Sequence, residues 1–111
     1  MNTRRLCERF VKDPVEVRLG GIASDLLRLS NLSVSQMRNT LIIQNVLDEI
    51  KFFTEWIAED VDFEMQKTLL SLQRTISSWG VGDQLKSHLL EINVQAKEWS
   101  ENILTSSGLG V

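Results

Sequence analysis

The only histidine of the chain, His88, stands three residues before Glu91, a spacing that places both side chains on one face of a helix. A histidine does acid–base or metal chemistry when a second group orients it or shares the metal. Helical di-iron sites need two Glu-x-x-His pairs and two further glutamates, which a chain with a single histidine cannot supply. We therefore interpret His88 as a rim residue that contacts Glu91, and we predict no catalytic, metal-binding or cofactor-binding residue.

Three other patterns that could carry chemistry have simpler explanations. Cys7 is the single cysteine and can form no internal disulfide. Gly20-Gly21 belongs to neither phosphate-binding pattern, G-x-x-x-x-G-K-[ST] or G-x-G-x-x-G, and no strand pattern precedes it. The acidic residues between 55 and 64 lack the spacing and the central glycine of a calcium loop. The sequence therefore favours a protein that is not an enzyme and holds no cofactor.

The three tryptophans, Trp56, Trp79 and Trp99, all lie late in amphipathic segments. Packing in the core explains them first, because a large ring with one N–H donor suits the end of a helical bundle. A small-molecule pocket near these tryptophans is the alternative.

Phe52 is the aromatic residue that is hardest to place in a core. Phe53 and Trp56 already fill the inward side of their helix, and Phe52 points about 100° away from them. With Glu49 and Lys51 nearby, we expect an exposed apolar surface that suits a second chain. A homodimer formed through this surface is a hypothesis of the sequence.

The apolar residues recur at three- and four-residue steps, which is the period of amphipathic helices. Four such segments are predicted, at about residues 14–31, 34–59, 62–79 and 83–105. Short polar connections between them make consecutive helices antiparallel. We therefore predict an all-α protein, and within that class an antiparallel up-and-down four-helix bundle.

The second segment is the longest, and we expect it to be the central helix. Ser33 and Gln36 match the S-x-x-Q capping box that satisfies free amides at a helix start. Its apolar positions begin at Met37. The face that we expect to meet the other helices consists of Ile43, Val46, Ile50, Phe53 and Ile57.

The first segment carries a core stripe of Leu19, Ile22, Leu26 and Leu29. Arg18, Asp25 and Arg28 are assigned to its outer side. Gly20-Gly21 in its middle costs helix stability, so we expect either a kink or the close approach of a neighbouring helix there. The second possibility makes Gly20 and Gly21 part of a predicted interaction surface.

Polar residues and glycines mark the ends of the last two helices. Asp60 or Asp62 is expected to cap the third helix, and Gly80 to end it. Asp83 is expected to cap the fourth. Its apolar stripe includes the small Ala96 between larger residues, as close packing against a facing helix requires.

Length, composition and charge fit one globular domain over residues 1–111. The chain is 42% apolar and 24% charged. Its net charge of −3 divides into +3 for residues 1–40 and −6 for residues 41–111. A basic helix packed beside acidic ones explains this division, and a nucleic-acid-associated protein that uses the basic N-terminal third is the alternative.

The N-terminal residues 1–12 are expected to be a loosely ordered arm with a short helical turn that lays Leu6 and Phe10 on the bundle. They show no secretory h-region, and the longest strongly apolar run, Leu41 to Ile43, is far too short for a membrane span. With a single cysteine, the sequence favours a reducing, cytoplasmic location.

Four stretches together resemble a group of small, uncharacterised helical proteins of cyanobacteria. The stretches are PVEVRLGGIASDLLRLSNL, FFTEWIAED, LLSLQRTISSW and QAKEWSENILTSSGL. The resemblance extends from Pro14 to Leu109 and implies a helical fold. It implies no reaction and no functional residues.

The sequence therefore predicts a non-enzymatic protein-interaction module or small structural subunit that binds another protein or itself. The surfaces expected to do so are the apolar strip of the second helix and the Gly20-Gly21 face of the first. The pathway is not indicated by any motif.

Overall fold

The computed structural model describes residues 3–35 and 39–107, and this part of the chain is helical without a strand. Its five α-helices are α1 (Thr3–Lys12), α2 (Val15–Val34), α3 (Thr40–Ile57), α4 (Phe63–Ser78) and α5 (Leu89–Ser106). Two 3-10 helices, η1 (Ala58–Asp60) and η2 (Gly82–His88), precede α4 and α5. The predicted all-α class is confirmed, although the described residues form five α-helices where the sequence predicted four.

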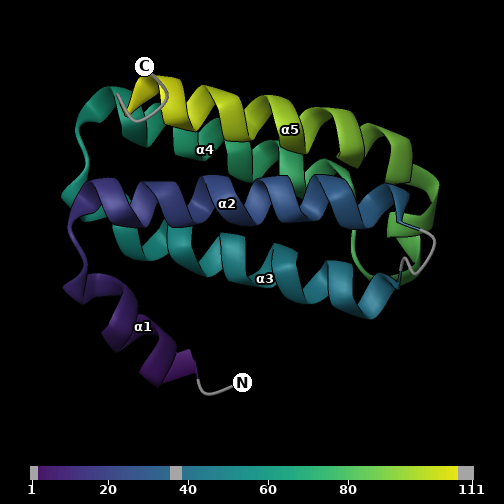
Figure 1. Cartoon of the computed structure of the whole chain (residues 1–111), viewed down its shortest axis with the longest axis horizontal. Helices are drawn as coiled ribbons and strands as arrows, with labels where there is room; N and C mark the ends of the chain where they lie inside the picture. The colour runs from purple at the N-terminus through teal and green to yellow at the C-terminus, as the bar shows by residue number, and fades with distance from the viewer. Residues whose placement is uncertain (1–2, 36–38, 108–111) are drawn as a thin grey trace.

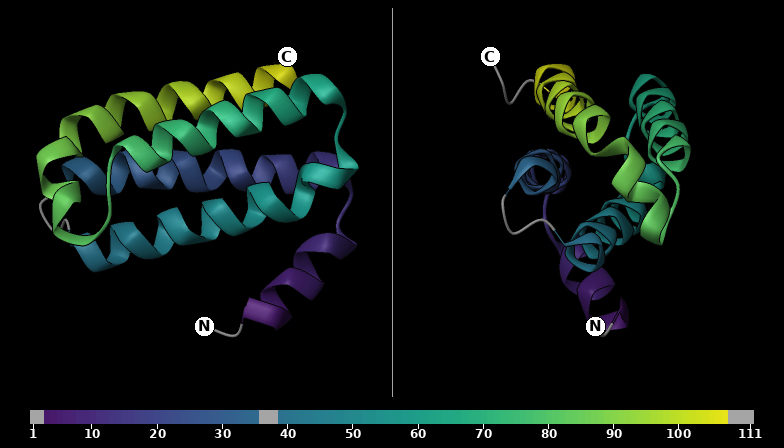
Figure 2. Two further views of the ribbon diagram at one scale, coloured as in Figure 1. Left: turned by 180° about the vertical axis from the view of Figure 1, so that it is seen from behind. Right: turned by 90° about the vertical axis from the view of Figure 1, so that its right-hand side faces the viewer.

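The helices α2 to α5 lie side by side, and the chain reverses direction at each connection between them (Figure 1). Helix α2 packs against α3 and α5, and α4 packs against the same two helices. The end-on view shows α1 outside this group, where it leaves α2 at an angle (Figure 2). Its main contact is with α3. None of the described helices is long and apolar enough to cross a membrane.

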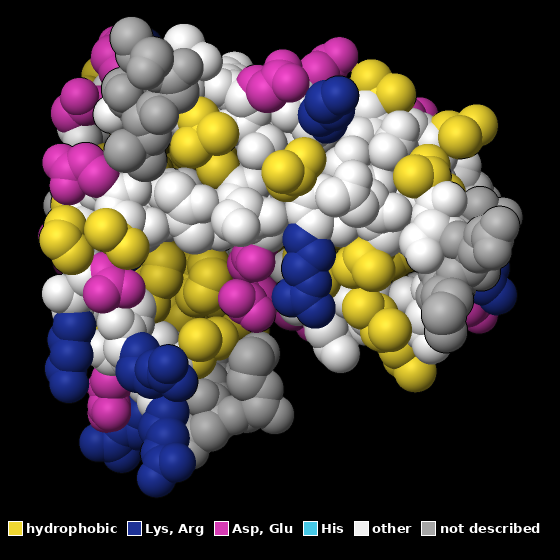
Figure 3. Space-filling model, in the orientation of Figure 1, with side chains coloured by type: hydrophobic (Ala, Val, Ile, Leu, Met, Phe, Trp, Pro, Cys, Tyr) yellow, Lys and Arg dark blue, Asp and Glu magenta, His cyan; other side chains and the backbone are white. Residues whose placement is uncertain are grey.

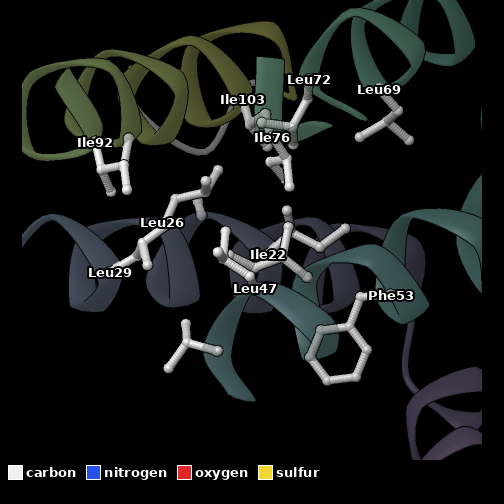
Figure 4. Packing of buried hydrophobic residues seen from close by; sticks show 14 of the residues in the cluster. Ile22, Leu26, Leu29, Leu47, Phe53, Leu69, Leu72, Ile76, Ile92 and Ile103 are labelled. Carbon is white, nitrogen blue, oxygen red and sulfur yellow. The ribbon is translucent and has the colours of Figure 1, made fainter. Parts of the chain in front are cut away.

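The core lies between α2, α3, α4 and α5, where the apolar stripes meet (Figure 4). The stripe predicted for the first helix is at most 4% exposed, and all five predicted core residues of the second helix are buried. The residues with no exposed surface include Ile22, Leu26, Ile43, Ile50, Leu72, Ile76, Ile92 and Ile103. The three- and four-residue spacing therefore identified the faces that pack together.

Helix α2 ends later, and helix α3 begins later, than the sequence predicted. Ser33 is not a cap: it lies inside α2, fully buried, and its hydroxyl donates to the carbonyl of Leu29 at 2.8 Å. Because that hydroxyl finds an acceptor in its own helix, it does not interrupt the helix. Asn39 caps α3 by accepting from the amide of Leu41 at 2.8 Å. Gln36 and Met37, the other predicted start residues, lie outside the described residues.

The pair Gly20-Gly21 does not interrupt α2, which runs continuously from Val15 to Val34. A methyl group at Gly21 would meet nothing within 4 Å. No neighbouring helix therefore approaches closely at Gly21. The glycine costs helix propensity here without gaining contact across an interface.

At α4 the predicted ends are confirmed, whereas at the last helix the predicted start is wrong. Asp62 accepts from the amide of Met65 at 2.9 Å, and Gly80 follows α4 with a φ of 82°. Residues 82–88 form η2, and the side chain of Gln84 accepts from the amide of Val81 at 3.0 Å. Asp83, the predicted cap, instead pairs with a lysine on the surface at 3.5 Å.

Polar side chains fix how α2 and α5 lie against each other. The hydroxyl of Ser30 donates to the carbonyl of Asn93 at 2.7 Å, and the amide of Asn93 donates to the carbonyl of Ser30 at 2.9 Å. Two turns away, Ser100 donates to the carbonyl of Ala23 at 2.7 Å. Because the second contact pairs an earlier residue of α2 with a later residue of α5, the two helices are antiparallel.

Candidate functional site

Helix α1 is held on α3 by a cluster of aromatic rings. Phe10 of α1 stacks on Phe53 of α3 with ring centres 4.2 Å apart and planes 4° from parallel. Trp56 lies 6.0 Å from Phe10 and 5.9 Å from Phe53. Phe10 and Phe53 are each only 7% exposed. Leu6 of the same helix is partly buried against the core. The basic N-terminal helix is therefore anchored by Phe10 and Leu6, the two residues that the sequence predicted to lie on the bundle.

Phe52 belongs to this cluster and is half-buried. Its ring stacks on Trp56 at 5.5 Å with planes 10° apart. Glu49 lies toward α2, where its charge raises the pKa of Asp25. Lys51, two residues later, is about 200° around the helix from Glu49. Phe52 lies three residues after Glu49 and so on the same side of α3, whereas Lys51 lies on the other side of the helix from Glu49. An interaction surface made of Phe52, Glu49 and Lys51 stays a prediction.

Arg18 is buried beneath α1, although the sequence placed it on the outer side of its helix. Its side chain is 6% exposed, and Nη1 donates to Oδ2 of Asp60 at 2.8 Å. The guanidinium carbon lies 5.8 Å from the centre of the Phe10 ring, within the range of a cation–π contact. Its Nε is buried without a hydrogen-bond partner. Arg18 thus connects α2 with α1 and with the end of α3.

Asp25 also faces a neighbouring helix rather than the predicted outer side. Burial, the charge of Glu49 and a hydrogen bond with Glu49 raise the pKa of Asp25 to about 7, against an opposing effect of Arg28. Oδ2 of Asp25 is buried without a hydrogen-bond partner.

These contacts meet where α1, α2 and α3 come together, and we call this region the α1–α2–α3 corner. Its residues are Phe10, Arg18, Asp25, Glu49, Phe52, Phe53, Trp56 and Asp60. Figure 3 shows a hollow on this face between α1 and α2, with hydrophobic side chains at its floor and acidic and basic side chains beside it. The corner combines a cluster of aromatic rings, the buried guanidinium of Arg18 and the carboxyl groups of Asp25 and Glu49.

The three tryptophans occupy separate environments. Trp56 belongs to the corner, and Trp99 is half-buried against the core. Trp79 is fully buried, and its indole N–H donates to Oε1 of Gln95 at 3.0 Å. The pocket beside Trp79 has a volume of about 410 Å³ and includes His88 but neither of the other tryptophans.

His88 has the contact that the sequence predicted. Its Nδ1 lies 3.3 Å from Oε2 of Glu91, and its side chain is 34% exposed. A larger pocket of about 490 Å³ lies where the start of α3 meets η2, and Asn39 and Lys86 are among its lining residues. In the described part of the chain, no group of three or more His, Cys, Asp or Glu residues could hold a metal ion.

Arg18 and Asp25 are the site residues that the sequence missed. Arg18 precedes Ile22 by four residues and so lies at the edge of the core stripe, which was the available signal. Its charge argued for the surface, but the long side chain runs along the helix to reach Asp60. Nothing in the sequence of α2 alone shows that Asp25 meets Glu49, because the partner is on another helix.

Comparison with known proteins adds no assignment. No family model matches the chain, and neither the curated proteins nor the solved structures give a match.

Proposed function

We propose that this chain is a protein-interaction module, a small structural subunit that pairs with a second copy of itself through the outer side of α2 and α5. The observation that carries the proposal is a group of exposed apolar side chains on these two helices. Leu90 is 79% exposed, Val94 55%, Val34 48% and Leu27 45%. We call these four residues the α2–α5 face.

The hydrogen bonds between α2 and α5 place the four residues near one another. Ser30 bonds Asn93. Val34 lies one turn after Ser30, and Leu90 lies one turn before Asn93, so in antiparallel helices both are at the same end of this contact. Figure 3 shows separate hydrophobic side chains along both helices on this side of the molecule. Because the four residues belong to two helices that lie side by side, one partner surface could cover them together, which favours contact with another chain.

The same face has the features of a self-complementary interface. Two small residues, Gly20 and Ser24, precede Leu27 by seven and three positions and so lie on its side of α2. Their small side chains leave room beside the larger side chain of Leu27. On α5 the exposed Lys97 and Glu101 continue the spacing of Leu90 and Val94 at steps of three and four. An isologous dimer uses the same patch on both copies, so Lys97 and Glu101 offer each copy one cation and one anion at the edge of the apolar residues.

We also propose that α2 to α5 form an antiparallel up-and-down four-helix bundle, to which α1 is attached as an additional helix. The support is that each of these four helices packs against its neighbours in chain order and that α2 also packs against α5. A cytoplasmic location and the resemblance to cyanobacterial proteins stay predictions.

Leu41 and Ile42 at the start of α3 are also exposed, at 74% and 41%. The alternatives of a ligand pocket near the tryptophans and of a nucleic-acid contact by the basic N-terminal third stay predictions.

Sedimentation of the full chain over a range of concentrations tests the proposed dimer. We expect a reversible monomer–dimer equilibrium in the micromolar range, and we expect Leu90→Glu to be monomeric, because it places a charge in the centre of the apolar contact. Leu70→Glu is the matched control, since Leu70 is 49% exposed on α4, away from this face, and should dimerise like the parent chain. A parent chain that is monomeric at high micromolar concentration contradicts the proposal.

A further inference from the structure

Helix α1 has one apolar side and one charged side. Its apolar residues fall within an arc of about 140° around the helix axis, and they are Leu6, Cys7, Phe10 and Val11. Its charged residues occupy the other side, and they are Arg4, Arg5, Glu8, Arg9 and Lys12. All five charged residues are exposed. Helix α1 is therefore amphipathic, and its outer side is basic.

The positive charge of the N-terminal third resides in α1 alone. Four cations and one anion give this helix a net charge of +3. Residues 13–40 carry three cations and three anions, which sum to zero, and residues 41–111 carry −6. Figure 3 shows Lys and Arg side chains gathered on α1, where it projects from the other helices. An anionic partner is therefore attracted to α1 and repelled by the second half of the chain.

The other helices cover only one edge of the apolar side of α1. Phe10 is 7% exposed, and Leu6 is partly buried against the core. Cys7 is half-buried, and Val11 at the opposite edge of the arc is 46% exposed. The apolar side is thus wider than its contact with the bundle. An apolar side flanked by cations is typical of helices that lie in the interface of a lipid bilayer.

The attachment of α1 allows it to exchange α3 for another apolar surface. It lies outside the group formed by α2 to α5, and its main contact is with α3 (Figure 2). Pro14 separates it from α2 with a ψ of 154°, so the backbone is extended between the two helices. A change of backbone angles at this connection would move α1 while the core between the other helices stays intact.

We propose that α1 binds the surface of an anionic lipid bilayer. The helix leaves α3 and lies in the plane of the membrane, with its apolar side among the acyl chains and its cations at the lipid phosphates. A nucleic acid would contact only the cations, whereas a bilayer covers both sides of the helix. The acidic second half of the chain is directed away from the surface. This contact does not use the α2–α5 face and does not depend on dimer formation.

Cosedimentation of the full chain with lipid vesicles tests this contact. We expect binding to vesicles that contain phosphatidylglycerol, no binding to vesicles of phosphatidylcholine alone, and weaker binding at high salt. The double variant with Arg4→Gln and Arg9→Gln should bind about tenfold more weakly or worse, because each cation near an anionic surface contributes about fivefold.

The matched control is the double variant with Lys67→Gln and Arg74→Gln. It removes the same charge from two exposed positions on α4, so it should bind vesicles like the parent chain. Equal weakening by the two double variants would overturn the proposal, because net charge rather than α1 would then govern binding.

Val11→Asn tests the apolar side of α1 without changing its charge. We expect this variant to fold like the parent chain and to bind vesicles more weakly, because an exposed apolar side chain that enters the lipid is lost. Val81→Asn is the matched control, since Val81 is 57% exposed in the connection after α4 and should have no effect on binding. Unchanged binding of Val11→Asn would overturn the proposal.

A fluorescent probe on Cys7 distinguishes a bilayer from other polyanions. Because Cys7 is the only cysteine, an environment-sensitive fluorophore can be attached to the apolar side of α1 alone. Its emission should shift to shorter wavelength when anionic vesicles are added, and duplex DNA at the same salt concentration should cause no such shift. Vesicle binding without this shift, or tighter binding to duplex DNA than to vesicles, would overturn the proposal.

Discussion

Arg18 shows how a single buried charge can organise the contacts of three helices. Its guanidinium donates to Asp60 after the end of α3, and it lies against the ring of Phe10 from α1. Burial of a cation is costly unless partners replace the lost water. Here one carboxylate and one aromatic face do so, while Nε stays without a hydrogen-bond partner.

We predict that Arg18→Ala lowers the free energy of unfolding by about 1–3 kcal/mol, because it removes a hydrogen bond between charged groups and the packing of a long side chain. Urea denaturation followed by circular dichroism measures the change. Arg28→Ala is the control, since Arg28 is exposed on the same helix, and it should stay within about 0.5 kcal/mol of the parent chain. Equal stability of both variants would show that the contact with Asp60 contributes nothing.

At the residue scale the sequence located the core side chains but not the polar ones that face other helices. Leu26 and Ile50 were identified because burial follows directly from helical spacing. Asp25 was assigned to the outside on its charge, and the partner that changes its chemistry is 24 positions away in the chain, on α3. Contacts of this kind depend on how helices are rotated against each other, which spacing within one helix does not determine.

At the scale of elements, α1 is the helix whose place depends on the fewest contacts. It projects from the other helices (Figure 2). Its largest anchor is Phe10, whose ring stacks on Phe53 and borders Trp56, while Leu6 is only partly buried. Loss of the Phe10 ring removes the stacking on Phe53 and the contact with Arg18 together, so it should release α1 without unfolding the rest of the chain.

We predict that Phe10→Ala speeds amide hydrogen exchange in residues 3–12 by tenfold or more and leaves exchange in the centre of α5 unchanged. The emission of Trp56 should also shift to longer wavelength, because water reaches its ring. Val11→Ala is the matched control, since Val11 is 46% exposed on the same helix and should keep the exchange rates of the parent chain. Unchanged exchange in Phe10→Ala would mean that other contacts hold α1.

A helix end was predictable where the capping side chain has only one helix to bond to. It was not predictable where the same side chain could either cap the next helix or bond within its own. Asp62 follows a turn and caps α4 as expected. Ser33 matches a capping pattern equally well, but it also falls on the core stripe of α2, and its hydroxyl bonds within that helix. The helix therefore continues past it, and Asn39 becomes the cap of the next one. Ser33 and Asn39 are both good capping residues, and the burial of the apolar face of α2 decided that Asn39 caps α3.

At the scale of the whole molecule, the pairing of α2 with α5 is the most extensive contact between helices, and it depends on small side chains. Ala96 has no exposed surface and lies between the hydrogen-bonded positions Asn93 and Ser100. Those bonds fix the distance between the two helices, so the space at Ala96 cannot widen without breaking them. The packing of α2 against α5 therefore depends on a side chain at position 96 that is no larger than a methyl group.

We predict that Ala96→Leu lowers the free energy of unfolding by about 1–3 kcal/mol, because the larger side chain separates α2 from α5. Circular dichroism and tryptophan fluorescence should report the same lowered urea midpoint if α2 to α5 unfold as one unit. Glu98→Leu is the control on the exposed side of α5, outside the α2–α5 face, and should unfold like the parent chain. An unchanged midpoint for Ala96→Leu would contradict the tight packing, and two separate transitions would show that α2 and α5 do not belong to one cooperative unit.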